Sequence, residues 1–287
     1  MRRKFMTNQP NIGKVILAGA GPGDPGLITV KAARYLRQAD VVLTDRLVSE
    51  EILNEYVPAS AKIIYVGKQY NQEASFQQES INELLVEHAL QGKFVVRLKG
   101  GDVAILSNIL DEIKTLSENN IPYEIIPGVT AASGASAYAA IPLTARGHAT
   151  SVRFLTYYKT DVVTDQYWKE LAGTNDTLVL YMSSGTLASV VQHLTENNIE
   201  ADKLLAVIEQ ATTPLQKVNV INIYDYATLW KDKKFLSPSL VIIGKVVALH
   251  EQYAWMNNSS IQDYYFKPVD EQAALTNKNG EPLINEK

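Results

Sequence analysis

Short apolar runs alternate with segments of helical periodicity along the first half of the chain. Val30, Ala33 and Leu36, for example, recur at the spacing of one helical face. Buried strands are predicted at residues 14–18, 41–43, 62–66, 94–98 and 123–126. Helices are predicted over residues 29–38, 77–90 and 107–118. Strands and helices that alternate in this order predict a largely parallel sheet with helices on both faces.

A second domain is predicted to begin after Pro127 and Gly128, where small residues at 131–140 favour a closely packed helix. The pattern then becomes richer in strands, which are predicted at residues 152–155, 177–181, 204–208, 217–221 and 240–243, with a helix over 186–197. The fold class is therefore α/β, with two α/β domains. The predicted divisions are an N-terminal extension at 1–12, the first domain at 13–128, the second at 129–250, and a mobile tail at 251–287. Within that tail, residues 264–266 could dock on the body.

Composition narrows the class of protein. The 287 residues are 46% hydrophobic and 20% charged, as in ordinary globular proteins, and the net charge of −4 gives no basic field for nucleic acid. Cysteine is absent and no apolar run approaches the roughly 20 residues of a membrane span. The basic residues 1–6 precede a polar stretch, unlike a signal peptide. We therefore expect a soluble cytoplasmic protein that binds neither membranes nor nucleic acid. Four histidines without ligand spacing predict no metal site.

A glycine-rich turn follows the first predicted strand, at residues 19–24. A dinucleotide-binding turn would end in a third spaced glycine, but Asp24 stands there, and Pro22 removes a backbone donor. Two interpretations stay open at this point. The segment is either a plain tight turn or a place where a flat ligand without a phosphate approaches the backbone.

Three further strands end in polar or glycine-containing groups. These groups are Asp45 with the loop to residue 48, residues 66–68 with Lys68, and residues 97–102 with Gly100, Gly101 and Asp102. Taken singly, each fits a solvated loop, and Asp102 could simply cap the following helix. However, the carboxyl ends of parallel strands open on the same edge of a sheet, where such folds bind ligands. The recurrence therefore favours a site in which a carboxylate and an ammonium transfer protons.

These motifs together resemble the tetrapyrrole (corrin/porphyrin) methylases, and within them the uroporphyrinogen-III C-methyltransferases. The resemblance runs in order over about residues 13–250. It is carried by the segments 19–26, 45–48, 66–68, 96–102, 127–133, 141–144, 180–182, 209–214 and 237–249.

The resemblance implies two α/β domains with a cleft for S-adenosylmethionine between them, and a homodimer. The expected reaction methylates uroporphyrinogen III at C2 and C7, giving precorrin-2 for sirohaem or cobalamin and S-adenosyl-L-homocysteine as by-product. Asp45 is implied as proton acceptor and Lys68 as proton donor. The implied donor-binding residues are Pro22, Gly100, Gly101, Asp102, Ile105, Thr130, Ala131, Met182 and Ala211.

The substrate of such an enzyme carries many carboxylates, so arginines are expected around it. Our candidates are Arg46, Arg146 and Arg153, whereas one of Arg97 and Lys99 could merely cover the sheet edge.

The chain departs from the family pattern where the tetrapyrrole is expected to bind. Residues 103–112 are apolar and compatible with a helix, and the family's arginine of that loop is missing. Ala145 replaces a familiar histidine, and Tyr157 and Tyr158 replace a Gly-His pair. Three alternatives stay open: a methyltransferase for a later corrin intermediate, an RNA or protein methyltransferase, and a non-catalytic relative that binds the donor or a tetrapyrrole.

Overall fold

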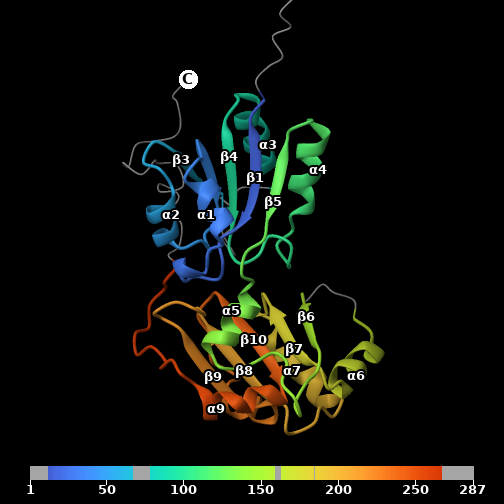
Figure 1. Cartoon of the computed structure of the whole chain (residues 1–287). Coiled ribbons are helices and arrows are strands. Elements are labelled where there is room, and N and C mark those ends of the chain that lie inside the picture. The colour runs from blue at the N-terminus through green and yellow to red at the C-terminus, as the bar shows by residue number, and fades with distance from the viewer. Residues whose placement is uncertain (1–11, 67–77, 159–162, 184, 267–287) are drawn as a thin grey trace, which may run out of the picture. The chain divides into compact units, whose positions relative to one another are not determined.

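The computed structural model describes residues 12–66, 78–158, 163–183 and 185–266, which Figure 1 shows as ribbons. The described chain divides into two compact units. Unit 1 contains residues 12–21 and 25–128, and unit 2 contains residues 22–24 and 129–266. Each unit is built on its own five-stranded sheet.

Every strand pair of unit 1 is parallel, as the sequence pattern predicts. The order across the sheet is β3-β2-β4-β1-β5. The strands are β1 (Lys14–Gly19), β2 (Val41–Thr44), β3 (Lys62–Tyr65), β4 (Phe94–Lys99) and β5 (Tyr123–Ile126). In such a sheet the carboxyl ends of β1, β2 and β4 lie at one edge, which brings their following loops together.

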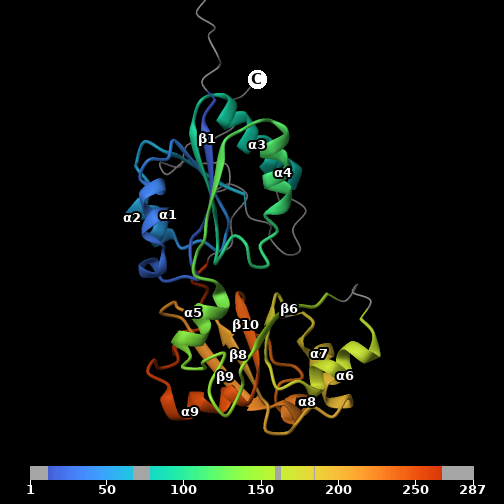
Figure 2. The same cartoon turned by 45° about the vertical axis from the view of Figure 1, so that its right-hand side comes forward.

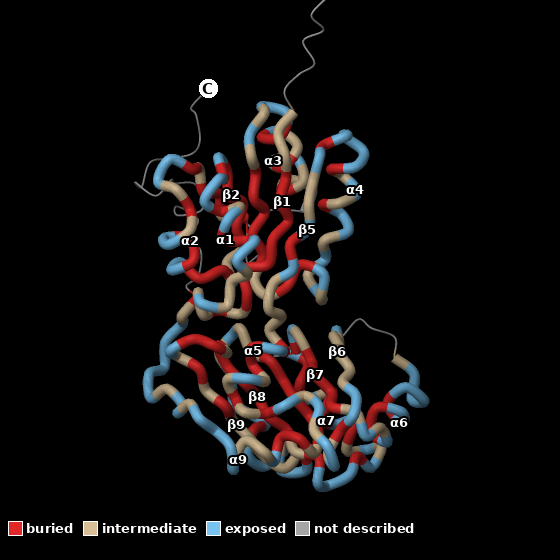
Figure 3. Tube along the Cα trace, in the orientation of Figure 1, coloured by how far each residue is buried: buried red, intermediate tan, exposed pale blue. Residues whose placement is uncertain are grey.

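Helices cover both faces of this sheet. They are η1 (Pro25–Leu27), α1 (Val30–Leu36), α2 (Glu50–Tyr56), α3 (Gln78–Leu90) and α4 (Leu110–Glu118). Side chains alternate along each strand, so Ile16 and Val96 join a core with α1 and α2, while Val15 and Val95 join a second core with α3 and α4. Burial on both faces explains why the central strands are continuous apolar runs (Figure 3).

The edge strand β5 carries an ionic cluster around Glu124. This carboxylate accepts hydrogen bonds from Lys14 on β1 at 2.8 Å and from the Tyr35 hydroxyl on α1 at 2.7 Å, and it also pairs with Lys31. Hydrogen bonds from Lys14, then from Lys31 and Tyr35, lower the pKa of Glu124 from 4.5 to about 2. The cluster ties α1 to the sheet.

The sheet of unit 2 is mixed rather than parallel. Its order is β6-β7-β10-β8-β9, in which only β6 and β7 run parallel. The strands are β6 (Val152–Thr156), β7 (Thr177–Tyr181), β8 (Leu204–Glu209), β9 (Lys217–Asn222) and β10 (Ser239–Gly244). β8 and β9 follow each other as an antiparallel pair with no helix between them, and this excludes a wholly parallel sheet.

The helices of unit 2 again lie on both faces of its sheet (Figures 1 and 2). They are α5 (Ala131–Tyr138), α6 (Asp165–Gly173), α7 (Leu187–Glu196), η2 (Ile223–Asp225), α8 (Tyr226–Leu229), η3 (Lys245–Ala248) and α9 (Leu249–Tyr253). Trp168 and Val190 place α6 and α7 against one face, whereas Ala132 and Ala135 place α5 against the other. Alanines allow α5 to approach the strands closely.

The C-terminal segment, residues 254–266, does not form part of a separate tail. It belongs to unit 2, and its Phe266 side chain is only 3% exposed. Polar side chains and backbone groups attach it to the sheet, which is why no apolar periodicity marks it in the sequence. Residues 267–287 lie outside the described residues.

Among the helices of the described residues, none combines the length and the apolar character that crossing a membrane requires.

Candidate active site

In unit 1 the loops after β1 and β4 are joined directly. The Gly21 N–H donates to the Gly101 carbonyl at 3.1 Å, and the Gly101 N–H donates to the Gly21 carbonyl at 2.7 Å. Gly101 has a φ of 70°, a left-handed conformation that glycine adopts without strain. The two glycine-containing segments singled out in the sequence therefore form one structure at the carboxyl edge of the sheet.

Asp102 holds this structure together. One carboxylate oxygen accepts the Ala104 N–H and the other accepts the Gly128 N–H, both at 2.8 Å. The side chain is buried. It does not cap the following helix, because α4 begins at Leu110 and has Ile109 at its N-cap position. Asp102 thus ties the loop after β4 to the end of β5.

Residues 103–109 are not helical, so the predicted helix over 107–118 begins too early. Leu106 and Asn108 have φ values of 52° and 50°, in the left-handed region, which ends any right-handed helical path there. The Ser107 hydroxyl bonds back to the Val103 carbonyl. Ile105, a predicted donor-binding residue, is partly exposed on this loop.

Asp45 directly follows β2 and lies beside the loop after β4. Its Oδ1 accepts a hydrogen bond of 2.6 Å from Arg97 on β4, and 27% of its side chain is exposed. A Cβ on Gly100 would come within 2.7 Å of the Leu47 carbonyl, so the two loops are in close backbone contact. The candidate proton acceptor is therefore fixed in orientation and still accessible.

Arg97 and Lys99 share a buried counter-ion, Glu112 of α4. Glu112 accepts from Arg97 Nε at 2.9 Å and from Lys99 Nζ at 3.1 and 3.3 Å, and it is completely buried. Burial lowers the pKa of Arg97, but the carboxylates of Asp45 and Glu112 outweigh that effect and raise it. Neither cation covers the sheet edge. Both are engaged inside unit 1, which leaves them unsuited to binding a ligand's carboxylates.

Glu112 is the residue that the sequence interpretation missed. It lies in the stripe Ile109, Glu112, Ile113 and Leu116, which faces the sheet at helical spacing. Arg97 and Lys99 are two positions apart on a strand and therefore share one face. An acidic residue in an apolar stripe, opposite two basic residues on one strand face, is the signal that identifies such a network.

The remaining predicted charges have different surroundings. Arg46, next to Asp45, is partly exposed, and Arg146 is exposed in the turn between the bridged residues Ala145 and Ala149. Lys68 lies outside the described residues.

Arg153 differs from the expectation that it binds substrate carboxylates. Its guanidinium pairs with Asp176 and, at 2.6 Å, with Glu170 of α6. These pairs raise its pKa, with the hydrogen bond to Glu170 the largest cause. Because two carboxylates of the same unit already occupy the guanidinium, Arg153 fastens α6 to β6.

In unit 2, Pro22 packs against α5 at Gly134. A Cβ on Gly134 would lie 2.5 Å from Pro22 Cγ and 2.9 Å from Thr212 Cγ2. The Asp24 N–H donates to Thr212 Oγ1 at 3.2 Å, and the Tyr138 hydroxyl donates to the Asp24 carboxylate. Burial and this hydrogen bond raise the pKa of Tyr138 to about 12. Pro22 is thereby held next to the loop that carries Ala211.

The beginning of α5 is joined to the end of β7. The Thr130 and Tyr181 hydroxyls are 2.6 Å apart, and the Ala132 N–H donates to the Tyr181 hydroxyl at 3.0 Å. Met182 follows with a left-handed φ of 53° and a side chain that is 54% exposed. Thr130, Ala131 and Met182 are thus brought together with accessible surface, as a binding surface requires.

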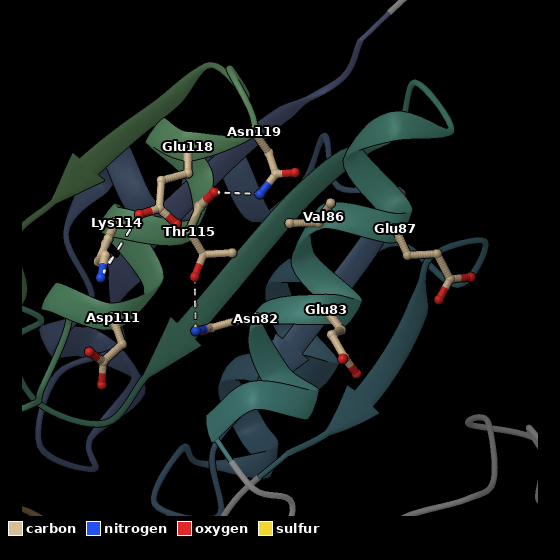
Figure 4. Close-up of a pocket in the computed structure, with 9 residues that line it drawn as sticks. All are labelled: Asn82, Glu83, Val86, Glu87, Asp111, Lys114, Thr115, Glu118 and Asn119. Atoms are coloured by element: carbon tan, nitrogen blue, oxygen red, sulfur yellow. Dashed lines mark hydrogen bonds and ion pairs between the residues drawn. The ribbon is translucent and has the colours of Figure 1, made fainter.

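An open groove elsewhere in unit 1 contains none of the candidate residues. It lies between α3 and α4 (Figure 4), where Asn82 donates to the Thr115 hydroxyl at 3.0 Å. Its lining residues are Asn82, Glu83, Val86, Glu87, Asp111, Lys114, Thr115, Glu118 and Asn119. The excess of carboxylates makes this groove unsuitable for an anionic ligand.

Comparison with known proteins gives consistent similarities. The family model of the tetrapyrrole (corrin/porphyrin) methylases matches residues 14–227. Siroheme synthase of Nitrosomonas europaea is 44% identical over 254 residues, covering 88% of this chain and 53% of that protein. The structure of uroporphyrin III C-methyl transferase from Thermus thermophilus is 34% identical with a TM-score of 0.69, covering 83% of this chain and 100% of that one. A second structure from T. thermophilus, of the enzyme complexed with S-adenyl homocysteine, is 33% identical with a TM-score of 0.68, over 82% and 93% of the two chains.

The chain spans about half the length of the curated relatives that it matches, from 53% to 54% of each.

Proposed function

The chain belongs to the tetrapyrrole (corrin/porphyrin) methylases, and on that premise we propose that it is an S-adenosylmethionine-dependent C-methyltransferase acting on uroporphyrinogen III. Methylation at C2 and C7 would give precorrin-2. The similarity to a uroporphyrin III C-methyl transferase over that enzyme's full length supports this substrate. The observation that carries the proposal is Asp45, an accessible carboxylate fixed by Arg97 at the carboxyl edge of a parallel sheet.

S-Adenosylmethionine supplies an electrophilic methyl group on sulfur, which an electron-rich pyrrole carbon can attack directly. The protein's main task is then to align the reacting groups. We assign donor binding to Pro22, Gly100, Gly101, Asp102, Ile105, Thr130, Ala131, Met182 and Ala211. All of these except Asp102 are at least partly exposed, and glycine, alanine and proline let a ligand approach the backbone. The complex of the T. thermophilus enzyme with S-adenyl homocysteine supports this donor.

Asp45 is assigned the removal of the proton that the methylated carbon or a neighbouring bridge must lose. Its Oδ1 accepts from Arg97, which fixes the plane of the carboxylate and leaves part of it accessible. Lys68 is assigned as the proton donor on the family resemblance alone. Arg46 and Arg146 are assigned to the substrate's carboxylates, since both are at least partly exposed and guanidinium groups pair well with carboxylates.

Three finer proposals rest on the same family grounds. The chain acts as a homodimer, it works in the cytoplasm, and its product feeds sirohaem synthesis or cobalamin synthesis. Analytical ultracentrifugation at micromolar concentration tests the first of these, with a monomer as the contradicting result.

A comparison of the Asp45→Asn variant with the unaltered protein distinguishes donor binding from proton transfer. Calorimetry should give both proteins the same affinity for S-adenosyl-L-homocysteine, because Asp45 is not assigned to donor binding. Transfer of labelled methyl groups to uroporphyrinogen III should be slower in the variant by about 10²–10⁴-fold, the range for loss of a general base. An equal transfer rate would remove Asp45 from catalysis, and failure of the unaltered protein to transfer methyl groups would contradict the function itself.

A further inference from the structure

The C-terminal segment, residues 254–266, pairs with the edge strand of unit 2. The side-chain amide of Asn258 accepts the Val218 N–H at 2.7 Å and donates to the Val218 carbonyl at 2.9 Å, as a neighbouring strand would. The Ser259 N–H donates to the Gln216 carbonyl at 3.0 Å. These contacts cover part of the outer side of β9, which pairs on its inner side with β8 and has no strand of the described residues on the outer side. The segment also lies beyond residue 227, where the family match ends.

The same segment is attached to α5, the helix that follows Thr130. Trp255 Nε1 donates to the Ala137 carbonyl at 2.9 Å, and its ring meets Tyr138 edge-on with 5.3 Å between centroids. Tyr138 in turn holds Asp24, beside Pro22. Through Trp255 the segment therefore supports two of the elements assigned to the donor.

A third attachment reaches the loop that carries Ala211. Gln210 Nε2 donates to the Asp263 carbonyl at 2.9 Å, and Gln210 Oε1 accepts the Tyr265 N–H at 2.7 Å. The Gln210 residue is 1% exposed, so water does not compete for these bonds. Both ends of one buried amide thus join residues that are far apart in the sequence.

The loop needs such support because its backbone is strained. Gln210 and Thr212, on either side of Ala211, have φ values of 49° and 67°, which residues other than glycine seldom adopt. Conformations of this kind persist only when the surroundings enforce them. Within the loop, Gln216 Oε1 accepts the Thr212 N–H at 2.8 Å and the Thr213 hydroxyl donates to the Gln210 carbonyl at 2.8 Å.

We propose that Gln210 is a positioning residue for donor binding, because its buried amide fastens the Ala211 loop to the C-terminal segment at Asp263 and Tyr265. The inference rests on the proposed function, in which Ala211 contacts S-adenosylmethionine. Gln210 does not touch the donor itself. It keeps the loop in the binding conformation, so the donor meets a larger fraction of competent protein.

Linkage makes the relation reciprocal. If attachment of the segment strengthens donor binding, then donor binding strengthens attachment of the segment by the same factor. The segment therefore becomes better protected from hydrogen exchange when donor or product is bound. A residue with only a structural role would not produce that response.

Gln210→Leu in the full chain tests the proposal, since leucine keeps a similar volume and loses both hydrogen bonds. Calorimetry with S-adenosyl-L-homocysteine should show about tenfold weaker binding, the equivalent of losing two ordinary hydrogen bonds. The KM for S-adenosylmethionine should rise by a similar factor while the KM for the tetrapyrrole is unchanged. Tyr253→Ala, at a side chain that is 58% exposed on neighbouring α9, is the matched control and should bind as the unaltered protein does.

Trp255→Ala is the second variant, and it is expected to fold because its side chain is 64% exposed. It should weaken product binding and remove the product-dependent protection of residues 254–266 in hydrogen exchange. Failure of the unaltered protein to bind S-adenosyl-L-homocysteine contradicts the proposed function. A different result separates the two proposals. If the unaltered protein binds S-adenosyl-L-homocysteine, and folded Gln210→Leu and Trp255→Ala bind it with the same affinity, the positioning role of Gln210 is overturned and the proposed function is not.

Discussion

Glu112→Gln should destabilise unit 1 by about 3–5 kcal/mol, the cost of removing one partner from a buried ion pair. The carboxylate is completely buried and accepts hydrogen bonds from both Arg97 and Lys99. When Glu112 loses its charge, Asp45 is the carboxylate left to balance the two buried cations. Within the described residues Asp45 pairs with Arg97 and not with Lys99. The amide oxygen that remains can still accept hydrogen bonds from these cations, which places the effect nearer about 3 kcal/mol. That loss is a large part of the roughly 5–15 kcal/mol that stabilises a typical domain.

Glu118→Gln on the same helix is the matched control. Glu118 pairs with Lys114 at 3.9 Å, and both side chains are more than half exposed. Such a surface pair contributes about 0–1 kcal/mol. A second variant, Glu112→Leu combined with Lys99→Met, removes both charges and should recover part of the stability that Glu112→Gln loses, because apolar side chains replace a buried ion pair at little cost.

The assay is urea unfolding monitored by hydrogen exchange. The backbone amides of β4 and α4 report the unfolding of unit 1. All 3 tryptophans, Trp168, Trp230 and Trp255, lie in unit 2. Their fluorescence therefore monitors the unfolding of unit 2, which serves as an internal reference. Separate readouts are needed because a chain of two units need not unfold in one step. A change below about 1 kcal/mol, equal to that of Glu118→Gln, would refute the buried network.

Three further predictions concern other parts of the chain. Gly134→Ala should destabilise unit 2 by about 1–3 kcal/mol in thermal unfolding because its Cβ meets Pro22, whereas Gly173→Ala, with nothing within 4 Å, should be neutral or stabilising. Hydrogen bonds, the one from Lys14 first, lower the pKa of Glu124 from 4.5 to about 2. The contribution of Glu124 to the stability of unit 1 should therefore be complete above pH 4.5 and disappear as the pH falls through about 2, and an NMR titration with a midpoint near 4.5 would contradict this. Asp102→Ala should abolish binding of S-adenosyl-L-homocysteine in calorimetry, since two backbone N–H groups lose their acceptor and the loop after β4 loses its shape; unchanged affinity would remove Asp102 from the donor site.

The parallel sheet of unit 1 was predictable because its signals are local. Continuous apolar strands alternate with helical segments, and Asp45 and Gly100 stand where strands end. In a parallel sheet those positions lie at the same edge, and in this structure the neighbouring strands β2 and β4 bring Gly100 against Leu47, two residues after Asp45. The fold class followed from the same pattern and is confirmed.

Other features depend on contacts that no local pattern encodes. Glu112 and Arg97 are 15 positions apart, and their pairing requires that α4 cover β4. The start of α4 depends on two left-handed residues, for which the sequence 103–109 gives no glycine as a sign. The C-terminal segment is attached through backbone groups and single amides such as Asn258. An extended segment of that kind has no periodic pattern of apolar residues, so its sequence predicts a mobile tail.

The central claim is most directly tested by anaerobic incubation of the protein with uroporphyrinogen III and S-adenosylmethionine, followed by mass spectrometry of the tetrapyrrole. Our account predicts a product with two added methyl groups, which NMR should locate at C2 and C7. A tetrapyrrole that gains no methyl group, from protein that binds S-adenosyl-L-homocysteine, would contradict the proposed substrate and direct the search to later corrin intermediates.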